Sequence, residues 1–527
     1  MNSPTAPVYA DANVRDMIAP FGLAVEYTRA EGNALYYQDD EGREIRVLDF
    51  ACGFGSLMLG HNNPDIAARA KEILDSQIPV HAQLAVHAHT NDLATALNNI
   101  IQRELDTDEP YYALFGNSGA EAVEIAIKHA EYDRLERAKE LLGSIETNTE
   151  AARTAVHAGT ADVADEAYEL LGITDRTSGG TGFENLIAEV TRRNEETSAV
   201  PPLFLTLEGS FHGKLGSSIQ LTHNETFRTP FKSLSAQARF VPADQPDALA
   251  KVVDDERVAA LDVVVDGSTV RVVERDFPVF GAFFLEPIRG EAGIRPLSRE
   301  FAQEVERVSA KLGCPVISDE IQSGTGRSGA FFAASHIGLR GDYIILAKSL
   351  AGGIAKTGIV LVREARYRQG FELIHSSTFG KDSFSSLIAL KVIETLEADN
   401  GQAYRTAAER GEKLRAALES VRTDFPDVVK DVRGRGLMLG LEFHDQSDAA
   451  SEVIREQTQS GYIGFAVAGY LLRNHRIRTF TTASALHTFR FEPPIYLSDE
   501  DIAQLETALR DVAGVLRRQD EQGFNAA

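Results

Sequence analysis

The fold is decided by residues 314–353, CPVISDEIQSGTGRSGAFFAASHIGLRGDYIILAKSLAGG. Two short apolar runs, in CPVISDEI and DYIILAK, are each followed by polar or glycine residues, which is typical of strands buried on both faces. Similar runs stand at 111–116 (YYALFG) and 280–288 (FGAFFLEPI), and helical patterns separate them. This alternation predicts an α/β fold whose mostly parallel sheet is covered by helices on both faces.

The segments on either side of this sheet predict a second, smaller lobe. Residues 20–50 alternate like a β-meander, and residues 63–103 have a helical pattern. Beyond Ser386 a long helix leads into 428–443 (VVKDVRGRGLMLGLEF), more helix and a last strand near 488–491. We expect an N-terminal segment (1–80) that contributes to the small domain, a large domain (81–385) and a C-terminal small α/β domain (386–527).

Two stretches look like additions to this core. Residues 132–198 are rich in charged residues and contain a Ser-Gly-Gly-Thr-Gly break at 178–182, which indicates solvated helices around a flexible loop. Residues 261–275, LDVVVDGSTVRVVER, place an Asp-Gly turn between two β-branched runs and predict a hairpin.

The composition excludes several classes of protein. The 527 residues carry a net charge of −25, which disfavours binding to nucleic acid or anionic lipid, and no apolar run is long enough to span a membrane. Cys52 and Cys314 are the two cysteines, so neither a disulfide framework nor a multi-cysteine metal site is expected. The N-terminus has no secretory pattern, and a cytoplasmic location is therefore expected.

Polar groups follow several of the predicted strands. In FGNSGAEA (115–122) a strand meets a helix at Ser118 and Gly119, a junction that suits a phosphate, although a simple helix cap is the commoner explanation. Asp319 and Glu320 end another strand, where they could pair with a protonated ring nitrogen or only cap a loop. Lys348 directly follows a buried strand and is a candidate for imine chemistry, although many such lysines lie on the surface.

The joint occurrence of nine segments carries more weight than any one of them. The sequence resembles the class III (ornithine/ω-amino acid) aminotransferases of pyridoxal-phosphate (PLP) fold type I over most of its length outside the two additions. The segments are LDFACGFGSLMLGHNNP, FGNSGAEA, EGSFHGKLGS, LEPIRGEAG, SDEIQSGTGRSGAFFA, AKSLAGG, HSSTFG, VRGRGLMLG and RFEPP.

The resemblance implies a cofactor site for PLP and its amino form. Lys348 would form the Schiff base and carry the proton, Asp319 would pair with the ring nitrogen, and Gln322 would bond the ring hydroxyl. Phe211 and Ile321 would cover the two faces of the ring. Thr378 from a neighbouring subunit would complete the phosphate site, which implies a homodimer with shared active sites. The full set of implied cofactor-binding residues is Ser118, Gly119, Ala120, Phe211, His212, Glu286, Asp319, Ile321, Gln322, Lys348 and Thr378.

The resemblance also implies substrate-binding residues. Arg490 would grip the α-carboxylate of glutamate or 2-oxoglutarate, and Glu291 would pair with Arg490 when a substrate lacks that carboxylate. Lys214 stands where many relatives have an arginine, and Phe54 stands where ornithine-specific members have a tyrosine. Arg289 replaces a usual glutamine, without a physical explanation at this level. These departures indicate a less polar second substrate.

The predicted function is therefore a PLP-dependent transaminase that moves an amino group from an amino acid, glutamate above all, to an aldehyde or ketone. The addition at 132–198 is reminiscent of aminotransferases from antibiotic pathways that aminate an aldehyde. The same scaffold supports aminomutases, racemases and decarboxylating transaminases, which remain alternatives. A non-catalytic PLP-fold protein would be expected to lack Lys348 or Asp319, and a nucleotide-binding reductase would need an early Gly-x-Gly-x-x-Gly motif.

Overall fold

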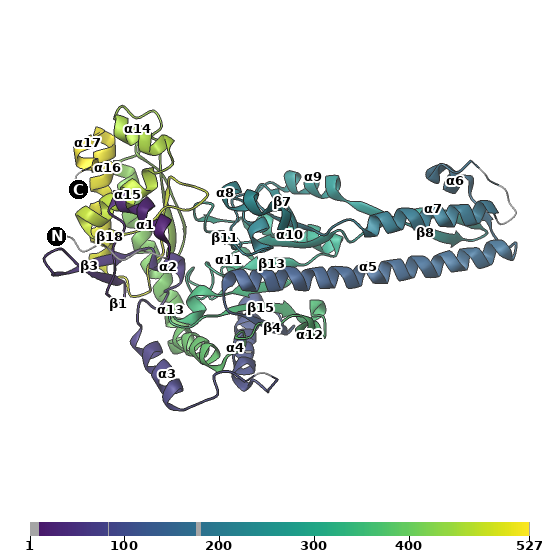
Figure 1. Ribbon diagram of the computed structural model, residues 1–527, viewed down its shortest axis with the longest axis horizontal. Helices are drawn as coiled ribbons and strands as arrows, with labels where there is room; N and C mark the ends of the chain where they lie inside the picture. Colours follow the sequence, from purple (N-terminus) through teal and green to yellow (C-terminus); the bar gives the residue numbers. More distant parts are fainter. Residues whose placement is uncertain (1–9, 83, 175, 177–180, 235, 526–527) are drawn as a thin grey trace.

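A seven-stranded sheet in the order β4-β15-β14-β13-β10-β6-β7 forms the centre of the molecule (Figure 1). The computed structural model describes residues 10–82, 84–174, 176, 181–234 and 236–525. Neighbouring strands run parallel except where β15 pairs with β14 and β4, so the predicted α/β class is confirmed. The strands are β4 (Tyr111–Gly116), β6 (Leu203–Leu207), β7 (Gln237–Val241), β10 (Phe280–Leu285), β13 (Val316–Asp319), β14 (Tyr343–Leu346) and β15 (Gly358–Arg363).

Strand β14 shows why these runs contain almost no polar residue. Tyr343 and Ile345 belong to the core that the first turns of α5 cover, whereas Ile344 and Leu346 belong to the core on the opposite face. Both faces of the sheet are therefore buried, as the continuous apolar runs predict. The helices of this part are α4 (Ala88–Leu105), α5 (Gly119–His157), α8 (Glu225–Arg228), α9 (Pro246–Glu256), α10 (Arg299–Leu312), α11 (Ala334–Ile337) and α12 (Phe371–Ile374).

A smaller lobe combines segments from both ends of the chain. The antiparallel meander β1 (Arg29–Glu31), β2 (Ala34–Gln38) and β3 (Glu44–Asp49) has the predicted form. Strand β18 (Ile477–Arg478), which the sequence did not predict, pairs with β3 in parallel. A second sheet has the order β16-β17-β19, with β16 (Val429–Arg435), β17 (Met438–Phe443) and β19 (Thr488–Phe491).

The helices of this region include α13 (Ser383–Asp424), which crosses the predicted boundary at 385/386 and is interrupted at 398–401. The boundaries after 80 and 385 stay predictions. The other helices are α1 (Ala12–Ile18), α2 (Cys52–Gly55), α3 (Pro64–Asp75), α14 (Glu452–Gln459), α15 (Ile463–His475), α16 (Asp499–Arg518) and α17 (Glu521–Asn525). No helix of the described ranges combines the length and the apolarity needed to cross a membrane.

The two predicted additions join into one projecting arm (Figure 1). The distal part of α5, α6 (Asp165–Leu171), α7 (Thr181–Ser198) and a three-stranded sheet of β5 (Asp162–Val163), β8 (Val258–Asp266) and β9 (Thr269–Phe277) form it. The predicted hairpin is present, since Asp266 pairs with Thr269 around Gly267. Residues 178–180 of the predicted flexible loop lie outside the described residues.

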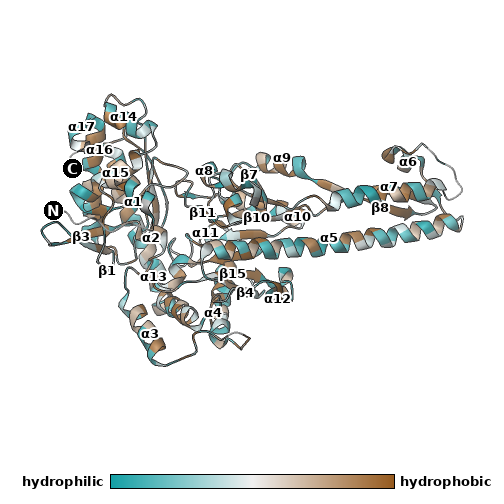
Figure 2. Ribbon diagram, in the orientation of Figure 1, coloured by the Kyte–Doolittle hydropathy of each residue, from teal (hydrophilic) through white to brown (hydrophobic). Residues whose placement is uncertain are grey.

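The arm has an apolar interior of its own, which the expectation of merely solvated helices missed. Phe183, Leu186 and Val190 of α7 pack with Ala152 of α5 and Val263 of β8. In Figure 2 the strand β8 is largely hydrophobic where it lies between α5 and α7, whose outward surfaces are mostly hydrophilic. The arm is therefore a packed unit rather than a loose insertion.

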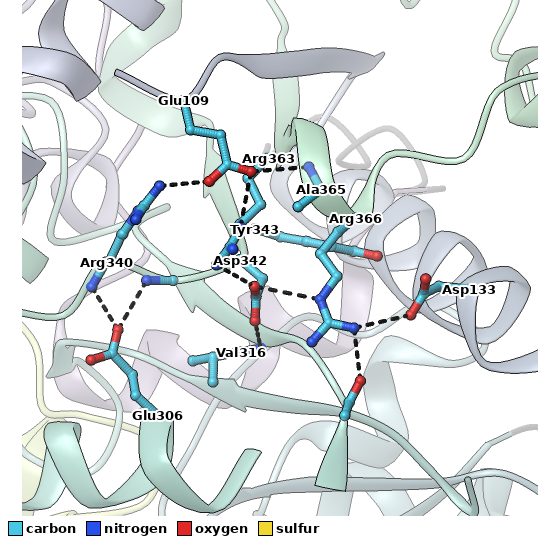
Figure 3. A network of polar contacts seen from close by, with 12 residues as sticks. Glu109, Asp133, Glu306, Val316, Arg340, Asp342, Tyr343, Arg363, Ala365 and Arg366 are labelled. Carbon is cyan, nitrogen blue, oxygen red and sulfur yellow. Dashed lines mark hydrogen bonds and ion pairs between the residues drawn. The ribbon is translucent and has the colours of Figure 1, made fainter. Parts of the chain in front are cut away.

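A network of charges ties together the amino ends of the central strands (Figure 3). Asp342 precedes β14, accepts a hydrogen bond from the backbone N–H of Val316 (2.8 Å) and pairs with Arg363 (2.9 Å). Glu109 pairs with Arg340 (2.6 Å) and with Arg363 (3.2 Å). Nearly every charge at this edge has a fixed partner, so we assign the network to structure rather than to chemistry.

We predict that Phe183→Ala loosens the arm and leaves the central sheet unaffected. Phe183 is 2% exposed, and removing such a ring from a core costs about 3–5 kcal/mol. Hydrogen exchange should become faster in α7 and β8, with unchanged protection in β13 and β14. Leu170→Ala, at a position of the arm that is 45% exposed, is the control and should change little. Equal loss of protection in the arm and the sheet would contradict a separately packed arm.

Candidate active site

The predicted site residues gather at the carboxyl edge of the central sheet, opposite the charge network of Figure 3. Asp319 is the last residue of β13 and pairs in register with Ile345 of β14, three residues before Lys348. Glu286 directly follows β10, and Ser118 follows β4. This edge is where ligands bind in open α/β sheets, because loops that leave neighbouring strands converge there.

Lys348 lies in the middle of this edge with a strained backbone. Its φ of +46° falls in the left-handed region, which a side-chain-bearing residue adopts only when its surroundings hold it there. Burial lowers the pKa of the Lys348 amine, and the carboxylates of Glu492 and Glu291 oppose that shift. Within the described part of the chain, no hydrogen bond or ion pair holds its Nζ atom. A buried amine without such a partner is suited to covalent bonding with a carbonyl group.

Asp319 is oriented by a buried histidine. Its Oδ2 atom lies 2.7 Å from His212 Nδ1, and His212 Nε2 lies 3.1 Å from the hydroxyl oxygen of Thr206. Burial alone would lower the pKa of His212, but the hydrogen bond and the charge of Asp319 outweigh it and raise that pKa. The pair can therefore present the second carboxylate oxygen of Asp319 to a cationic partner such as a protonated ring nitrogen.

Glu286 supports the loop on one side of this pair. Its carboxylate accepts hydrogen bonds from the backbone N–H groups of Phe211 and Gly290, both at 3.0 Å. Burial raises the pKa of Glu286 to about 7. Glu286 thus fixes the backbone from which Phe211 projects.

The junction of β4 and α5 has the predicted geometry for an anion. Ser118 caps α5, where its Oγ atom accepts a hydrogen bond from the backbone N–H of Glu121 (3.2 Å), and the residue is exposed. Gly213 closes the junction from the other side, since a Cβ there would lie 2.7 Å from the side chain of Ala120 and its φ is +115°. Ser118 can cap the helix while an anion binds at the same helix start, because the first turn of a helix has further backbone N–H groups without partners in the helix.

The opposite wall comes from Ile321 and Gly119. A Cβ on Gly119 would lie 2.9 Å from Ile321 Cδ1, so glycine lets the helix start reach this side chain. Together with half-buried Phe211, these residues fit pyridoxal phosphate. The unpartnered lysine, a carboxylate oriented by histidine and a helix start that suits phosphate are the donor set that this cofactor requires.

Thr378 is exposed on the loop between α12 and α13. Its neighbour Ser377 accepts a hydrogen bond from Asn117 Nδ2 (2.6 Å) of the same chain. This contact places the loop beside the junction of β4 and α5, where the phosphate site is predicted. That Thr378 contributes to the phosphate site of a second subunit remains a prediction.

Arg490 and Glu291 form a buried ion pair. Arg490 Nη2 lies 2.5 Å from Glu291 Oε2, which also accepts a hydrogen bond from the backbone N–H of Ala483 (2.6 Å). Burial would raise the pKa of Glu291, but the charge and hydrogen bond of Arg490 hold it below its usual value. The pKa of Arg490 is raised despite burial, because Glu291 and Glu492 act on it.

The sequence analysis missed Glu492, which stands inside the Arg-x-x-Pro-Pro motif. Glu492 is 0% exposed, and its Oε1 atom accepts a hydrogen bond from Gln322 Nε2 at 2.8 Å. Gly290 leaves room for Gln322, because a Cβ there would lie 1.9 Å from Gln322 Oε1. The sequence offered one indication of this residue, a carboxylate only two positions after Arg490, the arginine that is predicted to bind substrate.

Phe54 and Lys214, which are also predicted to bind substrate, have different surroundings. The Phe54 ring is 47% exposed, and its centroid lies 4.9 Å from the Arg490 guanidinium carbon. Lys214 is exposed and stacks over Phe227, with Nζ 3.6 Å from the ring centroid. Phe54 thus lies against Arg490, whereas Lys214 lies near Phe211, with Nζ 5.8 Å from that ring centroid.

Arg289, which the sequence left unexplained, has a structural role. Its Nη1 atom donates a hydrogen bond to the carbonyl oxygen of Glu208 at 3.0 Å. Glu208 directly follows β6, and Arg289 lies in the short strand β11 (Ile288–Arg289) just beyond β10, so the side chain joins the segments that leave two neighbouring strands. This contact helps to hold the loop that carries Phe211.

Comparisons with known proteins identify the family and the fold of the chain. The model of the aminotransferase class-III family matches residues 19–512. Similar solved structures include an ornithine aminotransferase from Toxoplasma gondii, with 20% identity over 94% of this chain and 92% of that chain and a TM-score of 0.65. A PLP-bound amine transaminase from an uncultivated Pseudomonas species is 19% identical over 97% and 98%, with a TM-score of 0.66. A thermostable ω-transaminase variant engineered for bulky amines is 18% identical over 98% of both chains, with a TM-score of 0.69. At these identities the structures establish the fold, and the family model establishes more: the chain belongs to the class III aminotransferases and is a PLP-dependent aminotransferase.

Proposed function

We propose that this enzyme takes an amino group from an amino acid, L-glutamate in the first instance, and delivers it to an aldehyde or ketone. The choice of glutamate as the amino donor is supported by the ion pair of Arg490 and Glu291 beside Lys348. A guanidinium group binds a carboxylate through two parallel hydrogen bonds, and Glu291 offers it a replacement partner when the substrate has no carboxylate. One pocket can then serve two chemically different substrates.

The roles of the cofactor-site residues follow from their surroundings. PLP, when bound, supplies the electron sink that weakens the bond to be broken. We assign the covalent attachment and the proton transfer at the substrate carbon to Lys348, since the lowered pKa of this amine favours its neutral form. Asp319, oriented by His212, would hold a proton at the ring nitrogen.

The acceptor is proposed to be a carbonyl compound with an apolar body, of the kind aminated in antibiotic pathways. Phe54 and Phe480 lie with ring centroids 6.1 Å apart beside Arg490. The amine of Lys214 stacks over Phe227, so the surroundings of Arg490 are proposed to offer the substrate aromatic surface more than a second positive charge. Such a lining recognises shape and apolarity rather than a second carboxylate.

Lys348→Ala is expected to abolish the visible absorption of the bound cofactor and the turnover while the fold is retained. Borohydride reduction of the wild-type holoenzyme followed by peptide mapping should place the pyridoxyl label on Lys348. Lys356→Ala, eight residues along the chain, is the control and should keep both properties. A label on another lysine, or normal turnover in Lys348→Ala, would falsify the assignment.

Arg490→Gln should raise the KM for glutamate and 2-oxoglutarate at least thirtyfold, since losing one partner of a buried charge pair costs about 2–5 kcal/mol. The double variant Arg490→Gln/Glu291→Gln removes both charges, so that no unpaired carboxylate is left to destabilise the fold. Arg433→Gln, in strand β16 of the same sheet, is the matched control. Half-reactions followed by cofactor absorbance give the result. If no keto acid converts the aminated cofactor, the enzyme is instead a racemase, aminomutase or related class III enzyme.

Shared active sites in a homodimer can be tested by subunit mixing. Thr378→Val should weaken PLP binding about tenfold to a hundredfold, because a hydrogen bond to a charged phosphate contributes about 1.5–3 kcal/mol. In hybrids with Lys348→Ala, one of the two sites combines an intact Lys348 with an intact Thr378 from the other subunit. At a PLP concentration too low to load Thr378→Val, mixing should therefore recover activity that neither variant has alone. Absence of recovery in verified hybrid dimers would place Thr378 in its own subunit's site.

A further inference from the structure

Arg490 has a second buried carboxylate beside it. Glu492 Oε2 lies 3.9 Å from Arg490 Nη1, on the side of the guanidinium group away from Glu291. Neither Arg490 Nη1, Arg490 Nε nor Glu492 Oε2 has a hydrogen-bond partner among the described residues. These three buried polar atoms belong to two neighbouring side chains. Their unused hydrogen-bonding capacity can be satisfied by a substrate group, and that of the arginine nitrogens also by Glu492 itself.

The two carboxylates differ in their freedom to move. Glu291 lies between Gly290 and Gly293, whose φ is +96°, and its side chain is 13% exposed. Glu492 has no exposed surface, its backbone N–H donates to the carbonyl oxygen of Phe50 (2.7 Å), and its Oε1 atom is bonded to Gln322. An entering carboxylate can displace Glu291 toward solvent. Glu492 has no such route and stays beside the arginine.

We propose that Glu492 is a specificity-determining residue that weakens the binding of α-carboxylates at Arg490 and so favours carboxylate-free amines and their carbonyl products. The inference rests on the proposed function of Arg490. A substrate carboxylate at Arg490 Nη1 must approach the fixed negative charge of Glu492, and like charges at this separation repel strongly in a buried site. An amine without a carboxylate leaves Arg490 paired with Glu291 and avoids that repulsion.

A purely structural role for Glu492 is the competing explanation. Arg327 is also fully buried, its Nε atom has no hydrogen-bond partner in the described ranges, and both side chains flank Gly55. Glu492 also holds Gln322, so its loss could shift the cofactor's spectrum. A structural role would weaken all substrates alike. A role in specificity changes the ratio between substrate classes.

The test compares wild-type and Glu492→Gln holoenzymes, because glutamine keeps the shape and removes the charge. Calorimetry with glutarate, an unreactive dicarboxylate, measures binding without turnover. We expect glutarate to bind about tenfold more tightly to the variant. The ratio of kcat/KM for glutamate to kcat/KM for a carboxylate-free primary amine should rise by a similar factor.

Glu442→Gln is the matched control. Glu442 lies in β17, next to the strand of Arg490, and its carboxylate pairs with Arg433 and Lys430. This control should change neither the glutarate affinity nor the substrate ratio. If Glu492→Gln does not fold, Glu492→Ser is measured in the same way.

Unchanged or weaker glutarate binding in a folded Glu492 variant overturns the inference, as does an unchanged substrate ratio. Failure of the proposed function gives a different result. In that case no amino acid or amine converts the cofactor, but glutarate binding still reports on Arg490 and Glu492.

Discussion

Burial of charge at the carboxyl edge of the central sheet is the constraint on which the rest of the site depends. Asp319, Glu286 and Arg490 are nearly or fully buried there, and Lys348 lies among them. Taking a charge out of water is costly unless a partner compensates it. His212 compensates Asp319 and Glu291 compensates Arg490, whereas Lys348 has no bonded partner among the described residues. The Lys348 amine, which lacks a bonded partner, is therefore the group available for reaction.

The two edges of the sheet solve the same problem differently. At the amino edge, Asp342 and Glu109 are tied to arginines and backbone N–H groups in a network (Figure 3). Among the described residues, buried polar atoms without a hydrogen-bond partner occur at both edges: Arg340 Nε at the amino edge, and Arg490 Nε and Glu492 Oε2 beside Lys348 at the carboxyl edge. A folded protein tolerates such atoms where a ligand is to satisfy them. Because Arg490 and Glu492 lie beside the reactive amine of Lys348, we assign their free hydrogen-bonding atoms to binding, and we assign the charge network of the amino edge to the stability of the fold.

Much of this could be predicted from the sequence, because local patterns encode strands and their ends. The apolar runs at 314–321 and 342–348 predicted β13 and β14, and the residues after them were chemically distinctive. Contacts between distant segments could not be derived in that way. The pairing of β18 with β3, and of Gln322 with Glu492 across 170 positions, depends on how the lobes pack. Glu492 was missed because a carboxylate in a motif shows neither its burial nor its partners.

The arm leaves the molecule at the edge opposite the site. Helix α5 starts at the phosphate junction and passes Asp133 at the amino edge before it extends beyond the sheet, while α7 and β9 return to the amino ends of β6 and β10 (Figure 1). Each inserted segment thus begins and ends on the side where no reacting group lies. Chain length can change there by dozens of residues without moving the strand ends that carry Asp319 and Lys348. The sheet therefore separates the edge from which the arm projects, where an engineered fusion would lie far from the site, from the edge that carries the reacting groups.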